Sequence, residues 1–211
     1  GKGKRFKSNN PKQFTNYINK PLFMHSVDKA LKSKLFKSII IVSNAPIKNI
    51  NDKSIKVIKG GKERYQSSQK ALNFLKNKKI KNVFIHDAAR PNFSIKLLKK
   101  LNANLKNNKA VVPFLKTDSS IKYKDGNILQ NLNRDKLIFT QTPQCFDYKT
   151  IYKISKLNKN LVTDEASLFL NYNKKIKFIK GEEDNFKITT KSDLGKLTIK
   201  SFYGIGFDIH R

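Results

Sequence analysis

Short apolar, β-rich runs alternate with helix-forming stretches along most of this chain, and this alternation restricts its fold more than any other feature. Strands are expected at Ile39–Ser43, Ile55–Ile58, Val83–His86 and Ala110–Leu115. Helices are expected at Leu22–Lys34, Ser67–Lys78 and Ser94–Asn107. Such alternation is typical of a doubly wound, mostly parallel α/β sheet, in which ligands bind at the carboxyl ends of the strands.

The pattern changes after Leu115, where two short alternating segments meet at Asp125-Gly126. Because Asp-Gly is a strong turn signal, residues 121–132 predict a β-hairpin, which either projects as an arm or extends a sheet edge. The α/β pattern then resumes. Further elements are expected at Leu137–Thr140 (strand), Tyr148–Lys156 and Thr163–Asn171 (helices), Lys175–Ile179 (strand) and Ser192–Ser201 (helix, with Ser192 as N-cap).

The domain organisation follows from these elements. Residues 1–201 are expected to form one domain, since the chain of 211 residues is long enough for a single α/β core. The tail Tyr203–Arg211 (YGIGFDIHR) opens a new apolar strand and stops within a motif. Residues 202–211 are therefore interpreted as the truncated start of a second domain. A start at Gly1 without Met is typical of a fragment.

Composition narrows the function classes. Cys145 is the only cysteine, which excludes an internal disulfide and favours a reducing, cytoplasmic setting. No apolar run approaches the roughly 20 residues of a membrane span, and no signal peptide is visible. The net charge of +30 leaves a basic nucleic-acid-binding protein as an alternative. The basic residues are mostly lysines scattered through the whole chain, so no specific nucleic-acid site is expected.

The first motif is the N-terminal stretch GKGKRFKSNNPKQF. Gly1 and Gly3 permit close approach of a ligand to the backbone, and Arg5 and Lys12 flank a polar loop. A Gly-rich basic loop beside a sheet can cradle phosphates, although the spacing is not that of a Walker loop. Nucleotidyl transfer needs mainly positioning and charge neutralisation. The alternative interpretation is a disordered basic terminus.

Two further motifs follow predicted strands. In GGKERYQSS, the pair Gly60-Gly61 lets a base or ribose approach the backbone, and Ser67 either binds a base edge or caps the following helix. In HDAARP, Asp87 is a candidate ligand for a hydroxyl or a metal. Arg90 either holds a phosphate or pairs with Asp87. His86 is interpreted as a core or supporting residue in preference to a general base.

Three later motifs are less specific. In QTPQCF, Thr142 is a candidate phosphate or hydroxyl ligand, and Cys145 is interpreted as a small buried hydrophobe. TDEASLF is interpreted as a helix start with Thr163 as N-cap and acidic residues in the first turn. Lys187, after an acidic turn, is either structural or a contact to a donor phosphate.

Taken together, these motifs resemble the 2-C-methyl-D-erythritol 4-phosphate cytidylyltransferases of the non-mevalonate isoprenoid pathway. The matching order is G-x-G-x-R with PKQ, GGxxRxxS, HDAARP, QTPQxF, TDEAS and N-x-K-I-T, over residues 1 to about 200. The resemblance implies a nucleotide-diphospho-sugar transferase fold and transfer of CMP from CTP, bound with Mg²⁺, to a phosphorylated polyol. Ribitol 5-phosphate remains an alternative acceptor. The tail resembles the opening of the 2,4-cyclodiphosphate synthases, which implies a bifunctional fusion.

The resemblance also implies residue roles. Catalytic roles fall to Arg5 and Lys12, as the cations that stabilise the transition state, and to Arg134 and Lys187, which position the acceptor. The implied CTP-binding residues are Gly1, Gly3, Gly61, Arg64 and Ser67. The implied acceptor-binding residues are Asp87, Arg90, Ser119 and Thr142.

In the resembled family the hairpin arm crosses into a partner subunit. The resemblance therefore implies a homodimer in which Ser119 and Arg134 act in the partner's site. Asp208 and His210 match two ligands of the synthase zinc site, which a closed catalytic site would complete with a third protein ligand. Zinc binding is accordingly expected only of a longer chain that contains the whole second domain.

Overall fold

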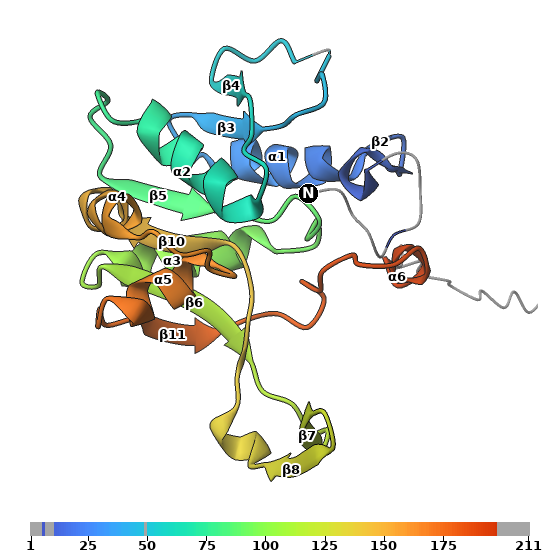
Figure 1. Ribbon diagram of the computed structural model, residues 1–211. Helices are drawn as coiled ribbons and strands as arrows, with labels where there is room; N and C mark the ends of the chain where they lie inside the picture. Colours follow the sequence, from blue (N-terminus) through green and yellow to red (C-terminus); the bar gives the residue numbers. More distant parts are fainter. Residues whose placement is uncertain (1–5, 7–10, 49, 198–211) are drawn as a thin grey trace, which may run out of the picture.

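The computed structural model describes residue 6 and residues 11–48 and 50–197. Its centre is a five-stranded mixed sheet. Four strands lie in the order β11-β6-β10-β5, and the fifth, β9, pairs with the last two residues of β6. These strands span Asn82–Ile85 (β5), Ala110–Leu115 (β6), Phe139–Thr140 (β9), Gln144–Asp147 (β10) and Lys177–Lys180 (β11). Figure 1 shows the strands stacked through the middle of the molecule, with helices on both faces.

Strand direction in this sheet is mixed. β11 runs parallel to β6, whereas β10 runs antiparallel to both β5 and β6 and lies between them. The mostly parallel arrangement is therefore confirmed for β5, β6 and β11, and β10 is a strand that the sequence pattern did not predict. Because β10 runs the opposite way, its first residue lies at the edge where the parallel strands end.

Side chains on alternate faces of the sheet enter two separate cores, as the period of two in a strand requires. Val111 and Cys145 face α3 (Ile95–Leu105), whose leucines fill one core. Val112 and Phe146 point to the opposite face, which is covered by three helices. These are α2 (Arg64–Phe74), α4 (Tyr148–Leu157) and α5 (Glu165–Asn171). Cys145 is fully buried, and burial raises the pKa of its thiol, so it is confirmed as a core residue.

The remaining elements form smaller units. Helix α1 (Leu22–Ser33) packs on the parallel pair β3 (Ile39–Val42) and β4 (Ile55–Ile58), which is separate from the main sheet. The short pieces are η2 (Lys12–Phe14), β1 (Asn16–Tyr17), β2 (Lys20–Pro21), η3 (Arg134–Lys136) and α6 (Ser192–Gly195). No helix among the described residues is long and apolar enough to cross a membrane.

A β-hairpin is formed by β7 (Ile121–Asp125) and β8 (Ile128–Leu132) around Gly126, which has a φ of 53°. In Figure 1 it lies away from the main sheet, at the end of two connecting segments. Large apolar side chains on and beside the hairpin are exposed: Tyr123, Ile128, Leu129, Leu132, Ile138 and Phe139.

Three predicted helix starts are wrong. Helix α2 begins at Arg64, three residues before Ser67, because Glu63 is the N-cap and forms a capping box with Gln66. Helix α5 is capped by Asp164, whose carboxylate accepts the backbone N–H of Ser167, so Thr163 is not the N-cap. Ser192 is the first residue of α6 and not its N-cap. The domain boundary expected at residue 201 lies outside the described residues.

Candidate active site

A polar cavity of about 190 Å³ opens at the edge of the sheet where β5, β6 and β11 end and β10 begins. Ligands bind at this edge in open α/β sheets. Three cations, two carboxylates and four neutral polar side chains line the cavity. They are Arg64, Arg90, Lys187, Asp87, Asp164, Thr140, Thr142, Gln144 and Thr163.

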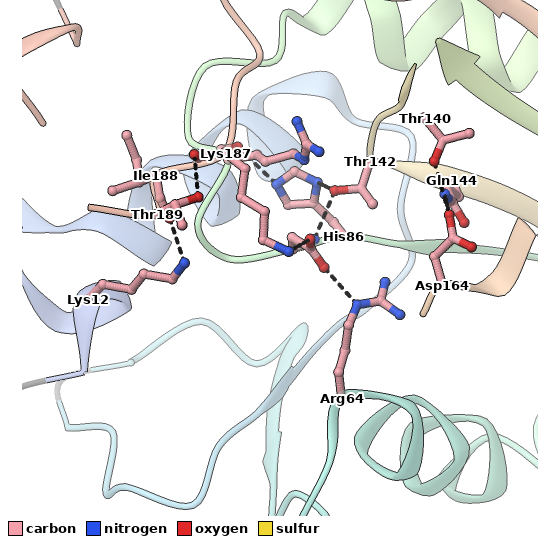
Figure 2. Close-up of polar contacts among 12 residues, drawn as sticks. Lys12, Arg64, His86, Thr140, Thr142, Gln144, Asp164, Lys187, Ile188 and Thr189 are labelled. Carbon is pink, nitrogen blue, oxygen red and sulfur yellow. Dashed lines mark hydrogen bonds and ion pairs between the residues drawn. The ribbon is translucent and has the colours of Figure 1, made fainter. Parts of the chain in front are cut away.

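Asp87 binds two cations on the charged side of this cavity. Its Oδ1 accepts a hydrogen bond from Nε of Arg64 at 2.9 Å, and its Oδ2 accepts one from Nζ of Lys187 at 2.6 Å. In Figure 2 the side chains of Arg64 and Lys187 point toward the same carboxylate. Burial raises the pKa of the Asp87 carboxyl, but the charges of Arg64 and Lys187 outweigh burial and hold that pKa well below its ordinary value. Asp87 is therefore an anion bound by two cations.

Arg64 is held from both sides. Its Nη1 and Nη2 donate to the two carboxylate oxygens of Glu165 at 3.0 and 2.9 Å, in addition to the bond from Nε to Asp87. Burial lowers the pKa of Arg64, but Glu165 and Asp87 raise it by more. The side chain of Glu165 is 1% exposed. A planar guanidinium that bridges two carboxylates in this way fixes the position of both.

Arg90 lies in the turn after β5, and it does not pair with Asp87 as one of the two interpretations of the sequence proposed. Its Nη1 donates to the backbone carbonyl of Asn185 at 2.8 Å, and its buried Nε has no hydrogen-bond partner. Burial lowers the pKa of the Arg90 guanidinium. An anion in the cavity would satisfy a cation that is desolvated and incompletely bonded.

The segment that carries Lys187 is anchored on Gln141, which is 3% exposed. The side-chain amide of Gln141 donates to the carbonyl of Glu182 at 2.7 Å and accepts the N–H of Glu182 at 3.1 Å. Asn185 adds a bond from Nδ2 to the carbonyl of Thr142 at 2.9 Å. A Cβ at Gly181 would lie 2.3 Å from Oε1 of Gln141, so only glycine allows this approach. These contacts fix Lys187 relative to Thr142.

Lys12 belongs to the same neighbourhood. Its Nζ donates to the carbonyl of Ile188 at 2.5 Å, which places the Lys12 side chain beside the segment that carries Lys187 (Figure 2). Gly61 and Ser67 lie at the start of α2, where the N–H of Gly61 donates to Oγ of Ser67 at 3.0 Å. Ser67 therefore acts locally as a partner of the glycine loop, and it does not cap the helix.

Other predicted site residues lie elsewhere. Ser119 and Arg134 are exposed near the base of the hairpin, where Arg134 donates to the carbonyl of Asp118, and neither lines the cavity. Gly1, Gly3, Arg5, Asp208 and His210 lie outside the described residues. Within the described part of the chain, no three His, Cys, Asp or Glu side chains gather as a metal site.

The sequence interpretation missed several residues of the cavity and its support: Glu165, Gln141, Gln144, Asp164 and Asn185. All five lie in motifs that were recognised, but their side chains were given structural roles or none. Asp164 accepts bonds from Thr140 at 3.1 Å and Gln144 at 2.8 Å, at the side of the cavity away from Lys12 in Figure 2.

From the burial of His86 we predict that the stability of the folded chain depends on pH. Burial lowers the pKa of this imidazole from 6.5 to about 4. Between these two values the unfolded chain binds more protons at His86 than the folded chain, so stability falls as the pH is lowered through this window. The loss is expected to reach about 3 kcal/mol. Urea unfolding at a series of pH values measures it.

The control for this pH dependence is His86→Gln, in which the fall in the free energy of unfolding between pH 6.5 and 4 should be smaller by the contribution of His86. In His25→Gln most of the fall should remain, because the ring of His25 is only partly buried. An equal slope in the unmodified chain and in His86→Gln would contradict the assignment to His86.

Comparison with known proteins identifies the family of this chain. The family model of 2-C-methyl-D-erythritol 4-phosphate cytidylyltransferase (IspD) matches residues 1–199. A bifunctional IspD/IspF enzyme of Pelagibacter ubique is 47% identical over the whole chain, which covers 58% of that relative. A cytidylyltransferase of Thermosipho melanesiensis is 34% identical over 97% of the chain and 95% of the relative.

A solved structure supports the same relationship. The 2-C-methyl-D-erythritol 4-phosphate cytidylyltransferase of Francisella tularensis superimposes with a TM-score of 0.81 at 30% identity, over 89% of this chain and 92% of that one. The sequence and the fold both match this family, and the nucleotide-diphospho-sugar transferase fold expected from the sequence is confirmed. The chain belongs to the 2-C-methyl-D-erythritol 4-phosphate cytidylyltransferase family.

Proposed function

We propose that this chain transfers CMP from CTP to 2-C-methyl-D-erythritol 4-phosphate, a step of non-mevalonate isoprenoid precursor synthesis. The observation that carries the proposal is the cavity at the sheet edge, in which Arg64, Arg90 and Lys187 surround Asp87. Its excess of positive charge suits an acceptor with a phosphate at one end, and its hydroxyl and amide groups suit the polyol at the other.

The reaction requires little covalent chemistry from the protein. An oxygen of the acceptor phosphate attacks the α-phosphorus of CTP, a new P–O–P linkage forms, and the bond to the β-phosphate breaks so that pyrophosphate leaves. No general base is required, because the attacking oxygen is already ionised near neutral pH. Catalysis then depends on positioning the two phosphates and neutralising the charge that develops between them.

On the donor side, we propose that Gly1, Gly3, Arg5 and Lys12 hold the triphosphate and that Gly61, Arg64 and Ser67 border the cytidine. The contact of Lys12 with Ile188 supports this proposal, because it places the Lys12 ammonium group beside the segment of Lys187. Since all three nitrogens of Arg64 bond to Asp87 and Glu165, its contribution is to hold these carboxylates.

Magnesium is proposed to enter with CTP. Both oxygens of Asp87 are occupied by cationic side chains, and the described residues form no cluster of three metal ligands. That arrangement fits Mg²⁺, which commonly binds substrate phosphates and few protein groups. When bound, the ion supplies further neutralisation of the triphosphate charge. Arg90 and Lys187 position the acceptor.

On the acceptor side, we propose that Asp87, Arg90, Thr142 and Lys187 of one subunit are joined by Ser119 and Arg134 of a second copy. The exposed apolar side chains of the hairpin support a homodimer, because exposed patches of this kind mark interaction sites. Ser119 and Arg134 lie at the base of the same hairpin, so a hairpin packed on a partner would carry them toward the partner's cavity.

We further propose that the enzyme is cytoplasmic and that a longer chain carries a second, cyclodiphosphate synthase domain. The 58% coverage of the bifunctional relative supports the second domain. Asp208 and His210 would contribute to its zinc site, together with a ligand beyond this sequence.

The proposed reaction is tested by release of pyrophosphate from CTP and Mg²⁺ with methylerythritol phosphate. We expect release that Lys12→Ala lowers strongly, because a cation at the reacting phosphates is removed. Ribitol 5-phosphate at the same concentration is the comparison, and it should be the poorer acceptor. Equal rates in the unmodified chain and in Lys12→Ala, or a preference for ribitol 5-phosphate, would contradict the proposal.

A further inference from the structure

His86 directly precedes Asp87, and the reaction described above makes no use of it. The ring is buried and packs edge-on against Phe93, with ring centroids 4.6 Å apart. Its Nε2 lies 3.0 Å from the carbonyl oxygen of Arg90 and 3.2 Å from Oγ of Ser26. Its Nδ1 lies 3.1 Å from Oγ1 of Thr142 (Figure 2). His86 therefore links the turn of Arg90 to the hydroxyl of Thr142.

These contacts decide which ring nitrogen carries the proton. A backbone carbonyl can only accept a hydrogen bond, so the short contact to Arg90 requires a proton on Nε2 of His86. The buried ring is neutral, and its Nδ1 then carries a lone pair. With the proton on Nδ1 instead, the carbonyl of Arg90 would face a lone pair at 3.0 Å, which is repulsive.

The tautomer fixes the direction of the Thr142 hydroxyl. Because Nδ1 of His86 is an acceptor, the Thr142 O–H donates to it. The same oxygen accepts the backbone N–H of Asp87 at 3.0 Å. A hydroxyl has one proton and two lone pairs, so only one lone pair of Thr142 remains for a ligand in the cavity that it lines.

We propose that His86 is a positioning residue that fixes Thr142 as a hydrogen-bond acceptor, so that Thr142 binds a hydroxyl group of the acceptor substrate and not its phosphate. The substrate in this statement rests on the proposed function. An ionised phosphate oxygen has no proton to donate and would face the lone pair of Thr142. A substrate hydroxyl donates to that lone pair, while Arg90 and Lys187 take the phosphate.

The first test measures the tautomer and is independent of any activity. In the ¹⁵N-labelled chain at pH 7, long-range nitrogen–proton spectra distinguish a protonated Nε2 from a protonated Nδ1, and the signals missing in His86→Gln identify His86. We expect a neutral ring with the proton on Nε2. A proton on Nδ1, or a charged ring, would overturn the proposal even if the chain is an active cytidylyltransferase.

The second test measures specificity. The kcat/KM of methylerythritol phosphate is compared with those of analogues that each lack one hydroxyl, in the unmodified chain, in Thr142→Val and in Thr142→Ser. We expect one analogue to be about 10-fold poorer with the unmodified chain and with Thr142→Ser, since a neutral hydrogen bond has about this value. In Thr142→Val this penalty should disappear, because the acceptor oxygen is gone.

The role of His86 is separated from simple packing by two variants of the same core. In His86→Phe the Thr142 hydroxyl loses the partner that holds its proton, so the penalty for the deoxy analogue should shrink. In Phe93→Leu, which removes the ring contact but leaves the hydrogen bonds of His86 in place, the penalty should stay. A penalty that is unchanged in Thr142→Val would overturn the proposal. Absence of pyrophosphate release with every acceptor would instead refute the proposed function and leave the tautomer result standing.

Discussion

Replacing Lys187 by alanine is expected to lower kcat/KM for the acceptor by about 10²- to 10³-fold, the usual effect of removing one fixed charge-stabilising group from an active site. Nζ of Lys187 lies 2.6 Å from Oδ2 of Asp87 and is held there by the Gln141 anchor of its segment. The loss should fall mainly on kcat if the ammonium acts in the transition state. Steady-state pyrophosphate release measures both constants.

Lys177→Ala is the matched control, because Lys177 is an exposed lysine on the neighbouring strand β11 and does not line the cavity. It should leave kcat/KM nearly unchanged. Mixing Lys187→Ala with Arg134→Ala adds a test of the dimer, since a mixed dimer would hold one site with neither change. Recovery of activity on mixing is expected. A Lys187→Ala enzyme as active as the control would remove Lys187 from the mechanism.

Replacing Glu165 by glutamine is expected to lower the free energy of unfolding by about 3 kcal/mol, as does the loss of one partner from a buried ion pair. Glu165 is 1% exposed and accepts both terminal nitrogens of Arg64. An amide keeps the volume of the side chain, but it has no charge and presents one oxygen and one NH₂ to a guanidinium that only donates. Urea unfolding at pH 7 measures the change.

Glu183→Gln is the comparison for this variant, since Glu183 is exposed in the turn after β11. Its free energy of unfolding should stay within about 0.5 kcal/mol of the original. Glu165→Gln should also lower activity, because Arg64 then loses one of the two carboxylates that align it with Asp87. If both variants unfolded at the same urea concentration, the pair of Arg64 and Glu165 would contribute little to stability.

The sequence was sufficient to predict the elements with a strong periodic pattern, such as Ile39–Val42, Ala110–Leu115 and α3. It was insufficient for β10, which follows Pro143 directly and begins with a buried glutamine. The start of α2 was misplaced because its N-cap is Glu63, and glutamate is not among the preferred N-cap residues. Local preference was overridden there by reciprocal bonds with Gln66.

The sequence was sufficient to predict the site residues that lie near the ends of strands. Asp87 lies two residues after the end of β5, and Thr142 and Lys187 lie in segments that the chain returns to the same edge. The bond between Arg64 and Glu165 joins residues 101 positions apart, and no local pattern contains that information. The acidic first turn of α5 was consistent with a simple helix-terminus effect, and only the packing of α2 against the site reveals its partner.

The position of β10 has a consequence for how this protein is made. Until β10 leaves the ribosome, the facing edges of β5 and β6 have no strand between them, although both strands precede it in the chain. Unpaired edges of this kind promote aggregation, and pairing across so many residues is slow. The hairpin is synthesised during this interval, so a nascent chain carries exposed apolar residues and two open edges together. Insertion of β10 pairs both open edges and joins β5 to β6. The cavity is complete only when the later residues Thr163, Asp164 and Lys187 have also reached the sheet edge.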